Sequence, residues 1–330
     1  MVQWAQERGE VGGVTRTVHL LTERLRAEGH EVTYVDTGSA KRAVRGLRAV
    51  GGRHTRHIFH ITRLWRAMVL APVFALLPGR SALVLHSGST ARQVAGMSGA
   101  QRRLLAASLR AYDEIWGVNG EIVRAVPRSL ADRVHVVTPY VDVTGEPLEG
   151  AASAERAESA ASAESAESGV REPHLVTVST NANQSHYGMD LALEAMGLVR
   201  ESWPDARLLV LAYGTDGPPM DELREELAEV AWAELTWNLP PEEVRRRLYR
   251  SAVFLRPTSW EGDSVIVREA LGAGARVVAT DVSPRPAGVE LAAATPSDLA
   301  EAVLRGGRRS DGAGLGSRSI LDAARAFAGC

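Results

Sequence analysis

Short runs of valine, leucine and isoleucine alternate with amphipathic helical patterns in both halves of the chain. In the second half, the predicted strands are 174–179, 207–213, 252–256 and 276–280, and the predicted helices are 189–201, 221–231, 242–250 and 264–272. Strands separated by helices of this length pair in parallel, because a parallel strand is reached only through a long crossover connection. The pattern therefore predicts an α/β fold of parallel sheets covered by helices, with ligands at the carboxyl ends of the strands.

The first half repeats this alternation with weaker signals. The predicted strands are 31–35, 81–85, 114–118 and 134–137, with a short strand at 1–4 and a helix over 17–28. Ser98 followed by Gln101 has the spacing of a capping box, which marks the start of another helix. Each half thus predicts a Rossmann-like sheet, and the cleft between two such lobes is the expected ligand site.

A segment of alanine, serine and glutamate separates the two halves. Residues 151–169 offer no apolar stripe that could pack against a core, which is typical of a linker or surface insertion. A length of 330 residues suits two domains. We therefore predict a first domain over 1–150, a linker over 151–169, a second domain over 170–319, and a closing helix over 320–330 that packs back on the first domain.

The charge is distributed unevenly along the chain. Residues 1–150 hold 20 Lys and Arg against 13 Asp and Glu, and the region between Thr37 and Tyr112 holds 13 basic residues and no acidic one. A basic half favours an anionic partner, such as a phosphorylated substrate, lipid headgroups or nucleic acid, although a solvated helical face explains it equally well. The apolar stretch 67–77 is shorter than the roughly 20 residues that span a bilayer. It is therefore predicted to be a buried helix or a helix lying on anionic lipid.

Other sequence features narrow the chemistry and the compartment. The single cysteine, Cys330, excludes an internal disulfide and gives no sign of a zinc site or a thiol nucleophile. No signal-peptide pattern is visible at the N-terminus, so the expected location is cytoplasmic.

Two glutamates separated by seven residues form the strongest candidate site. Glu261 lies in a turn directly after the predicted strand 252–256, and Glu269 lies in the helix that follows. That helix is expected to begin near Asp263 or Ser264, with Asp263 as its N-cap. Its first backbone amides are free to bind an anion such as pyrophosphate. One carboxylate at a sugar, amides at the phosphates and a second carboxylate at a ribose would suit a sugar nucleotide, whereas two surface charges are the simpler interpretation.

The segment from Arg256 to Asp281 resembles the donor-binding signature of retaining glycosyltransferases of family 4, which have the GT-B fold. It reads Arg-Pro-Thr, then Glu261, seven residues, Glu269-Ala-Leu, and a run ending in Val-Val-Ala-Thr-Asp. The following Ser-Pro-Arg-Pro-Ala-Gly, 283–288, is similar to members that act in cell-surface polysaccharide synthesis.

The first half resembles the same family more loosely. Gly12-Gly13 is similar to its glycine loop between the first strand and the first helix, where backbone approaches a ligand closely. His86, directly after a predicted strand, is similar to a histidine that members carry on the acceptor side. A lone histidine in this position also fits a structural role.

The resemblance implies that a sugar moves from a nucleotide-sugar donor to a glycan, lipid-linked or small-molecule acceptor. It makes Glu261 and His86 the candidate catalytic residues, and it makes the candidate donor-binding residues Gly13, Gly262, Ser264, Val265 and Glu269. No cofactor besides the donor and no nucleic-acid partner are implied. The sequence contains no Asp-x-Asp pair, which together with the resemblance indicates metal-independent transfer. The basic first half adds the expectation of peripheral attachment to the inner face of the membrane.

The chain departs from the family at the donor diphosphate. Most members carry Gly-Arg after the first strand of the second domain and Lys-Gly some residues later, whereas this chain has Ser179-Thr180-Asn181 and Tyr187-Gly188. Asn183, His186 or an arginine of the basic lobe are the candidate substitutes. The alternatives are a degenerate GT-B protein that acts as a binding or scaffold module and a sugar-nucleotide epimerase of similar fold.

Overall fold

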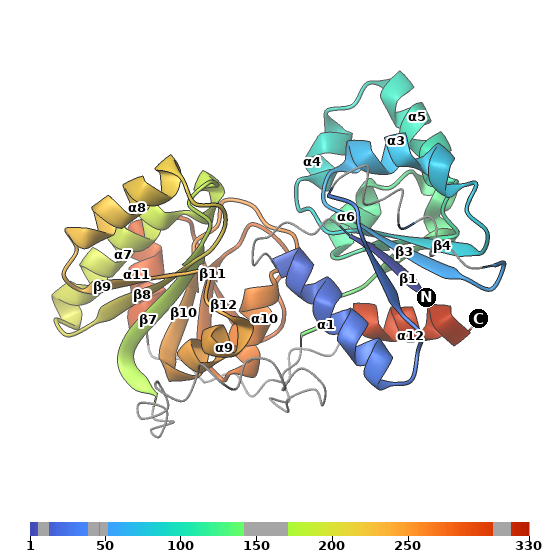
Figure 1. Ribbon diagram of the computed structural model, residues 1–330. Helices are drawn as coiled ribbons and strands as arrows, with labels where there is room; N and C mark the ends of the chain where they lie inside the picture. The colour runs from blue at the N-terminus through green and yellow to red at the C-terminus, as the bar shows by residue number, and fades with distance from the viewer. Residues whose placement is uncertain (6–12, 39–45, 47–51, 142–170, 306–317, 330) are drawn as a thin grey trace.

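Two parallel sheets of six strands each form the framework of the computed structural model, which describes residues 1–5, 13–38, 46, 52–141, 171–305 and 318–329. Figure 1 shows the sheets in two separate lobes, each covered by helices on both faces. The α/β architecture of two Rossmann-like lobes predicted from the sequence is confirmed. The linker predicted over 151–169 lies outside the described residues.

The first sheet has the strand order β2-β1-β3-β4-β5-β6. Its strands are β1 (Val2–Ala5), β2 (Thr33–Asp36), β3 (Arg56–Ile61), β4 (Arg80–Leu85), β5 (Glu114–Gly117) and β6 (Val134–Val136). Its helices are α1 (Gly13–Ala27) and α12 (Ile320–Gly329) on one face, and α3 (Leu64–Phe74), α4 (Thr90–Ala95), α5 (Gly99–Leu109) and α6 (Gly120–Ala125) on the other (Figure 1). Strand β1 lies between β2 and β3, so the short N-terminal strand is an interior one.

Helix α12 returns from the far end of the chain to the first lobe. Its apolar side chains, including Ile320 and Phe327, are buried in the same core as β1, β3, β4 and β5. Phe327 meets Trp116 edge-on at 5.8 Å between ring centroids, and its carbonyl accepts a hydrogen bond from Arg56 Nε at 3.0 Å. The two ends of the chain therefore lie in one lobe.

The second sheet has the order β12-β11-β10-β7-β8-β9. Its strands are β7 (Glu172–Thr180), β8 (Arg207–Ala212), β9 (Ala233–Trp237), β10 (Ser251–Arg256), β11 (Arg276–Thr280) and β12 (Val289–Ala292). Its helices are α7 (Met189–Ser202), α8 (Pro218–Ala228) and α11 (Pro296–Leu304) on one face, and α9 (Pro241–Arg250) and α10 (Val265–Gly272) on the other (Figure 1). The order reverses between β7 and β10, which is the switch point where open α/β sheets bind ligands.

Helix ends follow the capping signals with one exception. Ser98 and Gln101 form the predicted capping box at α5, and the Thr295 side chain caps α11. Helix α10 begins at Val265 with Ser264, not Asp263, in the N-cap position. The Asp263 carboxylate is instead held by Arg268, with 2.7 Å between Oδ1 and Nε and 2.6 Å between Oδ2 and Nη2.

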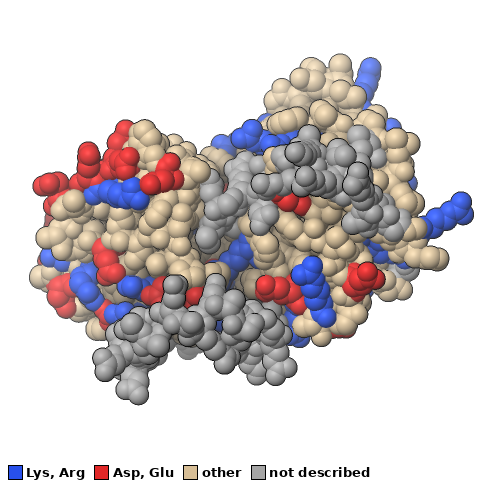
Figure 2. Space-filling view, in the orientation of Figure 1, with Lys and Arg blue, Asp and Glu red and all other residues tan. Residues whose placement is uncertain are grey.

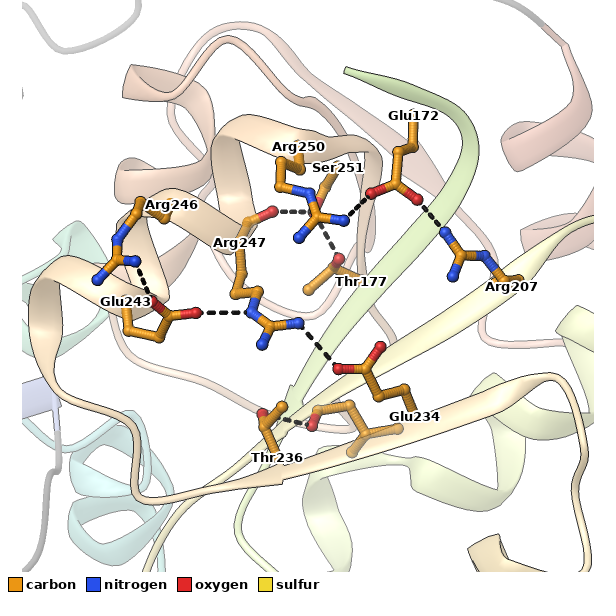
Figure 3. A network of polar contacts seen from close by, with 11 residues as sticks. Glu172, Thr177, Arg207, Glu234, Thr236, Glu243, Arg246, Arg247, Arg250 and Ser251 are labelled. Carbon is orange, nitrogen blue, oxygen red and sulfur yellow. Dashed lines mark hydrogen bonds and ion pairs between the residues drawn. The ribbon is translucent and has the colours of Figure 1, made fainter. Parts of the chain in front are cut away.

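An ion-pair network lies at the amino ends of the strands of the second sheet, opposite the carboxyl ends where ligands bind (Figure 3). Glu172 at the start of β7 accepts from both Arg207 and Arg250, and Arg247 joins Glu243 and Glu234 at 2.8 Å each. These side chains are partly exposed, so each pair contributes little to stability. The network mainly orients α9 against β7 and β9.

The surface of the two lobes differs in charge and polarity. Acidic side chains gather over α8 at the outer end of the second lobe (Figure 2), whereas the first lobe exposes large apolar side chains on and beside α3 and α5. These are Trp65, Val69, Leu76 and Leu104, at 53%, 63%, 84% and 59% exposed. Within the described residues, no helix is both long and apolar enough to cross a membrane.

Candidate active site

A cavity of about 250 Å³ lies between the lobes, over the carboxyl ends of β7, β8 and β10. All seven candidate catalytic and donor-binding residues from the sequence line it: Gly13, His86, Glu261, Gly262, Ser264, Val265 and Glu269. The first two come from the first lobe and the other five from the second. Residues more than 240 positions apart in the sequence thus meet at one pocket, as expected for a site between two lobes.

Glycines let the two lobes approach each other closely at this pocket. A Cβ atom at Gly88 would lie 2.2 Å from the Glu261 carbonyl oxygen, and one at Gly262 would lie 2.7 Å from the His86 carbonyl oxygen. Real Cβ atoms do not come this close to backbone, so the loop after β4 and the loop after β10 can pack only with glycine at both positions. The two loops thus contact each other and close the cleft between the lobes beside the pocket.

The Glu261 carboxylate is buried between two arginines of its own lobe. Arg256, the last residue of β10, donates to Oε1 from Nη2 and, at 3.0 Å, from Nε, and Arg285 donates to Oε2. Burial raises the pKa of Glu261, but the two arginines outweigh that effect and hold the pKa at about 2. Glu261 is therefore ionised at neutral pH, and Oε2, which accepts a hydrogen bond from Arg285 alone, keeps a lone pair for a further donor.

Arg256 crosses the switch point of the second sheet. Its Nη1 donates to the Ser179 carbonyl on β7 at 2.9 Å, and its guanidinium carbon lies 4.6 Å from the centre of the Tyr187 ring. The Tyr187 hydroxyl is hydrogen-bonded to that of Tyr213, at the end of β8. A buried cation therefore lies where β7, β8 and β10 end.

Glu269 faces the first lobe from the first turns of α10. Its Oε1 lies 2.8 Å from Nε of Arg16 on α1, and the side chains are only 11% and 10% exposed. Burial raises the pKa of Glu269, and Arg16 opposes that rise. The carboxylate that the family resemblance assigns to a ribose thus also forms an ion pair between the lobes.

The amino end of α10 opens on the same pocket. Gly262, Ser264 and Val265 line it, and the Ser264 side chain forms no cap hydrogen bond. Unpaired amides at a helix start attract anions through their N–H groups and the helix dipole. The geometry suits a phosphate group next to Glu261.

His86 is the pocket end of a buried chain of polar side chains. Its Nε2 lies 3.0 Å from Nδ1 of His60 on β3, and His60 Nε2 lies 2.6 Å from Oε1 of Gln3 on β1. Burial lowers the pKa of His86 to about 4 and that of His60 well below its usual value. Both rings are therefore neutral near pH 7. Neither His60 nor Gln3 was singled out in the sequence, because a polar residue in a strand gives no signal of where it points.

An aromatic stack joins the lobes at the rim of the pocket. Trp260, next to Glu261, stacks on His186 with 3.9 Å between ring centroids, and Arg92 of α4 lies 5.0 Å from its ring centre. Burial lowers the pKa of His186 to about 4, with Arg256 adding to the effect. His186 is therefore neutral near pH 7.

Of the substitutes considered for the missing family cations, His186 lines the pocket but is neutral near pH 7. Asn183 donates to the Thr215 carbonyl at 3.2 Å, and the pocket-lining arginine of the basic lobe, Arg16, is occupied by Glu269. The cation beside Ser179 and Tyr187 is Arg256. Its one sequence signal was a basic residue at the carboxyl end of an apolar strand. In the described part of the chain, no three His, Cys, Asp or Glu side chains gather as metal ligands.

The fold is that of the GT-B glycosyltransferases. The structure of HepE from Anabaena with UDP and glucose superposes with a TM-score of 0.65 at 10% identity, over 92% of this chain and 89% of that one. Sucrose-phosphate synthase from Thermosynechococcus elongatus gives 0.65 at 14%, over 99% and 94%. TarM gives 0.56 at 10%, over 85% of this chain, which spans about half the length of TarM (51%).

The second lobe matches a known family. Residues 172–306 match the family described as glycosyl transferases group 1. That range contains both glutamates, Arg256 and the whole second sheet. Among curated proteins, no sequence matches the chain.

Proposed function

We propose that this protein is a retaining glycosyltransferase that takes a sugar from a nucleotide-sugar donor. The observation that carries the proposal is the interlobe pocket at the switch point of the second sheet. Two buried carboxylates, Glu261 and Glu269, and the amino end of α10 line it together. The match of this lobe to glycosyl transferases group 1 supports the proposal. The signature from Arg256 to Asp281 is the support for retention and for family 4.

The side chains divide the proposed reaction among them. Glu261 accepts hydrogen bonds from the donor sugar and stabilises the positive charge that develops at its anomeric carbon. The bond from that carbon to the diphosphate breaks as a bond to the acceptor oxygen forms, and the acceptor proton leaves with the diphosphate. Amides of Gly262, Ser264 and Val265 stabilise the departing charge without a metal ion. Glu269 binds the ribose, the Gly13 backbone approaches the donor, and His86 presents the acceptor.

Nucleotide binding tests this proposal at its first step. Thermal unfolding is measured with UDP, GDP, ADP, CDP and their sugar conjugates. A ligand at 100 times its dissociation constant stabilises by about 2.7 kcal/mol, which raises the midpoint by about 4 °C if all 330 residues unfold together. We expect one nucleotide series to produce this shift. If no member of any series does so, the donor assignment is wrong.

We further propose that the acceptor is a glycan or is held at a membrane surface, with a role in cell-surface polysaccharide synthesis. Exposed Trp65, Val69 and Leu104 on α3 and α5 support the membrane part, together with the absence of acidic residues between Thr37 and Tyr112. Apolar side chains among basic ones bind the interface of anionic bilayers. The proposed location is the inner face of the cell membrane.

A further inference from the structure

We propose that Arg256 binds the donor diphosphate, in place of the two cations that this chain lacks at Ser179-Thr180-Asn181 and at Tyr187. The inference rests on the proposed function, since it names the residue that holds one part of the proposed donor. It assigns a role to a side chain that arises from β10 rather than from the loops after β7. The ligand class is a nucleoside diphosphate.

The position of the guanidinium is the first support. Arg256 donates to the Ser179 carbonyl at 2.9 Å and lies 4.6 Å from the centre of the Tyr187 ring. One cation thus contacts Ser179, in the first segment where the related signature has a cation, and Tyr187, at the second. Because β7 and β10 are neighbours at the switch point, a side chain at the end of β10 reaches this place directly.

The charge balance of the pocket is the second support. Asp263 is paired with Arg268 in a bidentate ion pair, so that carboxylate is neutralised one for one. Glu261 instead has two arginines, Arg256 and Arg285. This cluster therefore keeps one positive charge in a buried place next to the amino end of α10, where an anion gains most from it.

The two arginines of the cluster differ in how they are held. Arg285 does not line the cavity, and it donates to the Thr258 hydroxyl at 3.1 Å and to the Thr280 carbonyl at 3.2 Å as well as to Glu261. Arg256 lines the cavity, and its hydrogen bonds to described residues use three of its five N–H groups. Arg285 thus holds the Glu261 carboxylate in place. Arg256 faces the cavity and keeps N–H groups that can donate to a ligand.

Calorimetric binding of a nucleoside diphosphate and of the matching nucleoside tests the assignment. The measured quantity is the ratio of the nucleoside to the diphosphate dissociation constant, for whichever base wild type binds. In Arg256→Met this ratio should fall by roughly 10- to 150-fold, the range of a lost charge-assisted hydrogen bond, while nucleoside affinity stays at the wild-type value. A merely structural role for Arg256 would weaken both ligands together.

A matched control separates this effect from the loss of any buried arginine. Arg276 is also buried, but it is the first residue of β11 and so lies at the amino ends of the strands, away from the pocket. It donates to the Ala302 carbonyl at 2.8 Å. Arg276→Met should lower stability and leave the ratio unchanged. Should Arg256→Met not fold, Arg256→Met combined with Glu261→Gln removes the buried pair together and is compared with Glu261→Gln alone.

The outcomes are distinguishable from failure of the proposed function. If wild type binds no nucleoside diphosphate, the proposed function is wrong and the inference falls with it. If wild type binds one and the ratio is unchanged in Arg256→Met, or both ligands weaken equally, the function stands and the inference is overturned. A fall of the ratio in Arg256→Met but not in Arg276→Met supports it.

Discussion

The charge state of each ionisable side chain in this pocket is set by its burial and by the charged groups beside it. Glu261 stays ionised because Arg256 and Arg285 outweigh its burial, and His86 stays neutral because burial has no opposing carboxylate. The type and spacing of the two glutamates could be recognised from the sequence. The arginines that set their charge could not, because the pairs Arg16–Glu269 and Arg285–Glu261 join residues 253 and 24 positions apart.

Stability should fall as the pH is lowered from 7 to 5, because histidines with lowered pKa values, His86 among them, are neutral in the folded protein. The folded pKa of His86 is about 4, below the ordinary value of 6.5, so the unfolded chain binds more protons between these values and stability rises with pH there. His86 alone should contribute a loss of about 2 kcal/mol between pH 7 and pH 5. Urea unfolding at both pH values measures the loss.

Two variants identify the group responsible. His86→Gln should show a smaller pH-dependent loss than wild type, whereas His54→Gln, which removes an exposed histidine, should match wild type. Equal losses in wild type and His86→Gln would show that His86 does not cause the pH dependence.

Elements were predicted well where one face or both faces of a strand are plainly apolar. Strands β8, β10 and β11 and helices α7 and α9 begin and end within a few residues of the expected positions. Strand β3 was missed because His57 and His60 interrupt its apolar run, although both are buried and hydrogen-bonded. Strands β9 and β12 were missed because they lie at the sheet edges, where burial is incomplete and the pattern is weak.

The start of helix α10 departs from the N-cap preference of its sequence because of a side-chain contact. Asp263 is a good N-cap by type, but its carboxylate pairs with Arg268 and Ser264 takes the cap position. The buried arginine needs a counter-ion more than the helix needs a side-chain cap, since an unpaired buried charge costs several kcal/mol. The helix start is thereby left open toward the pocket.

The whole molecule presents lobes of different surface character. The second lobe gathers acidic side chains over α8 (Figure 2), and the first lobe exposes Trp65, Val69, Leu76 and Leu104 on and beside α3 and α5. Helix α3 corresponds to the stretch 67–77 that the sequence left open between a buried helix and an interfacial one. Ala67 and Ala71 are buried in the core, whereas Trp65 and Val69 are exposed, so the helix has one face for each role.

Vesicle sedimentation should show binding that depends on anionic lipid and falls at high salt, because screening weakens attraction between the basic lobe and the headgroups. Trp65→Ser should bind anionic vesicles more weakly than wild type at the same salt concentration, since it removes an apolar side chain that inserts into the interface. The control is Leu198→Ser, which changes an exposed apolar residue on α7 of the other lobe. If binding is the same on neutral and anionic vesicles, at low and high salt, and in wild type and Trp65→Ser, this surface is not the membrane contact.

Release of nucleoside diphosphate from a nucleotide sugar tests the central claim most directly, because it separates an enzyme from a scaffold of the same fold. Wild type is incubated with a metal chelator, with each nucleotide sugar in turn and with acceptor extracts. The account predicts release by wild type and a loss of turnover larger than the loss of nucleotide affinity in Glu261→Gln. It predicts weaker nucleotide binding, by about 1.5–3 kcal/mol, in Glu269→Ala. Nucleotide binding without release from any donor, or wild-type kinetics and affinity in both variants, would contradict it.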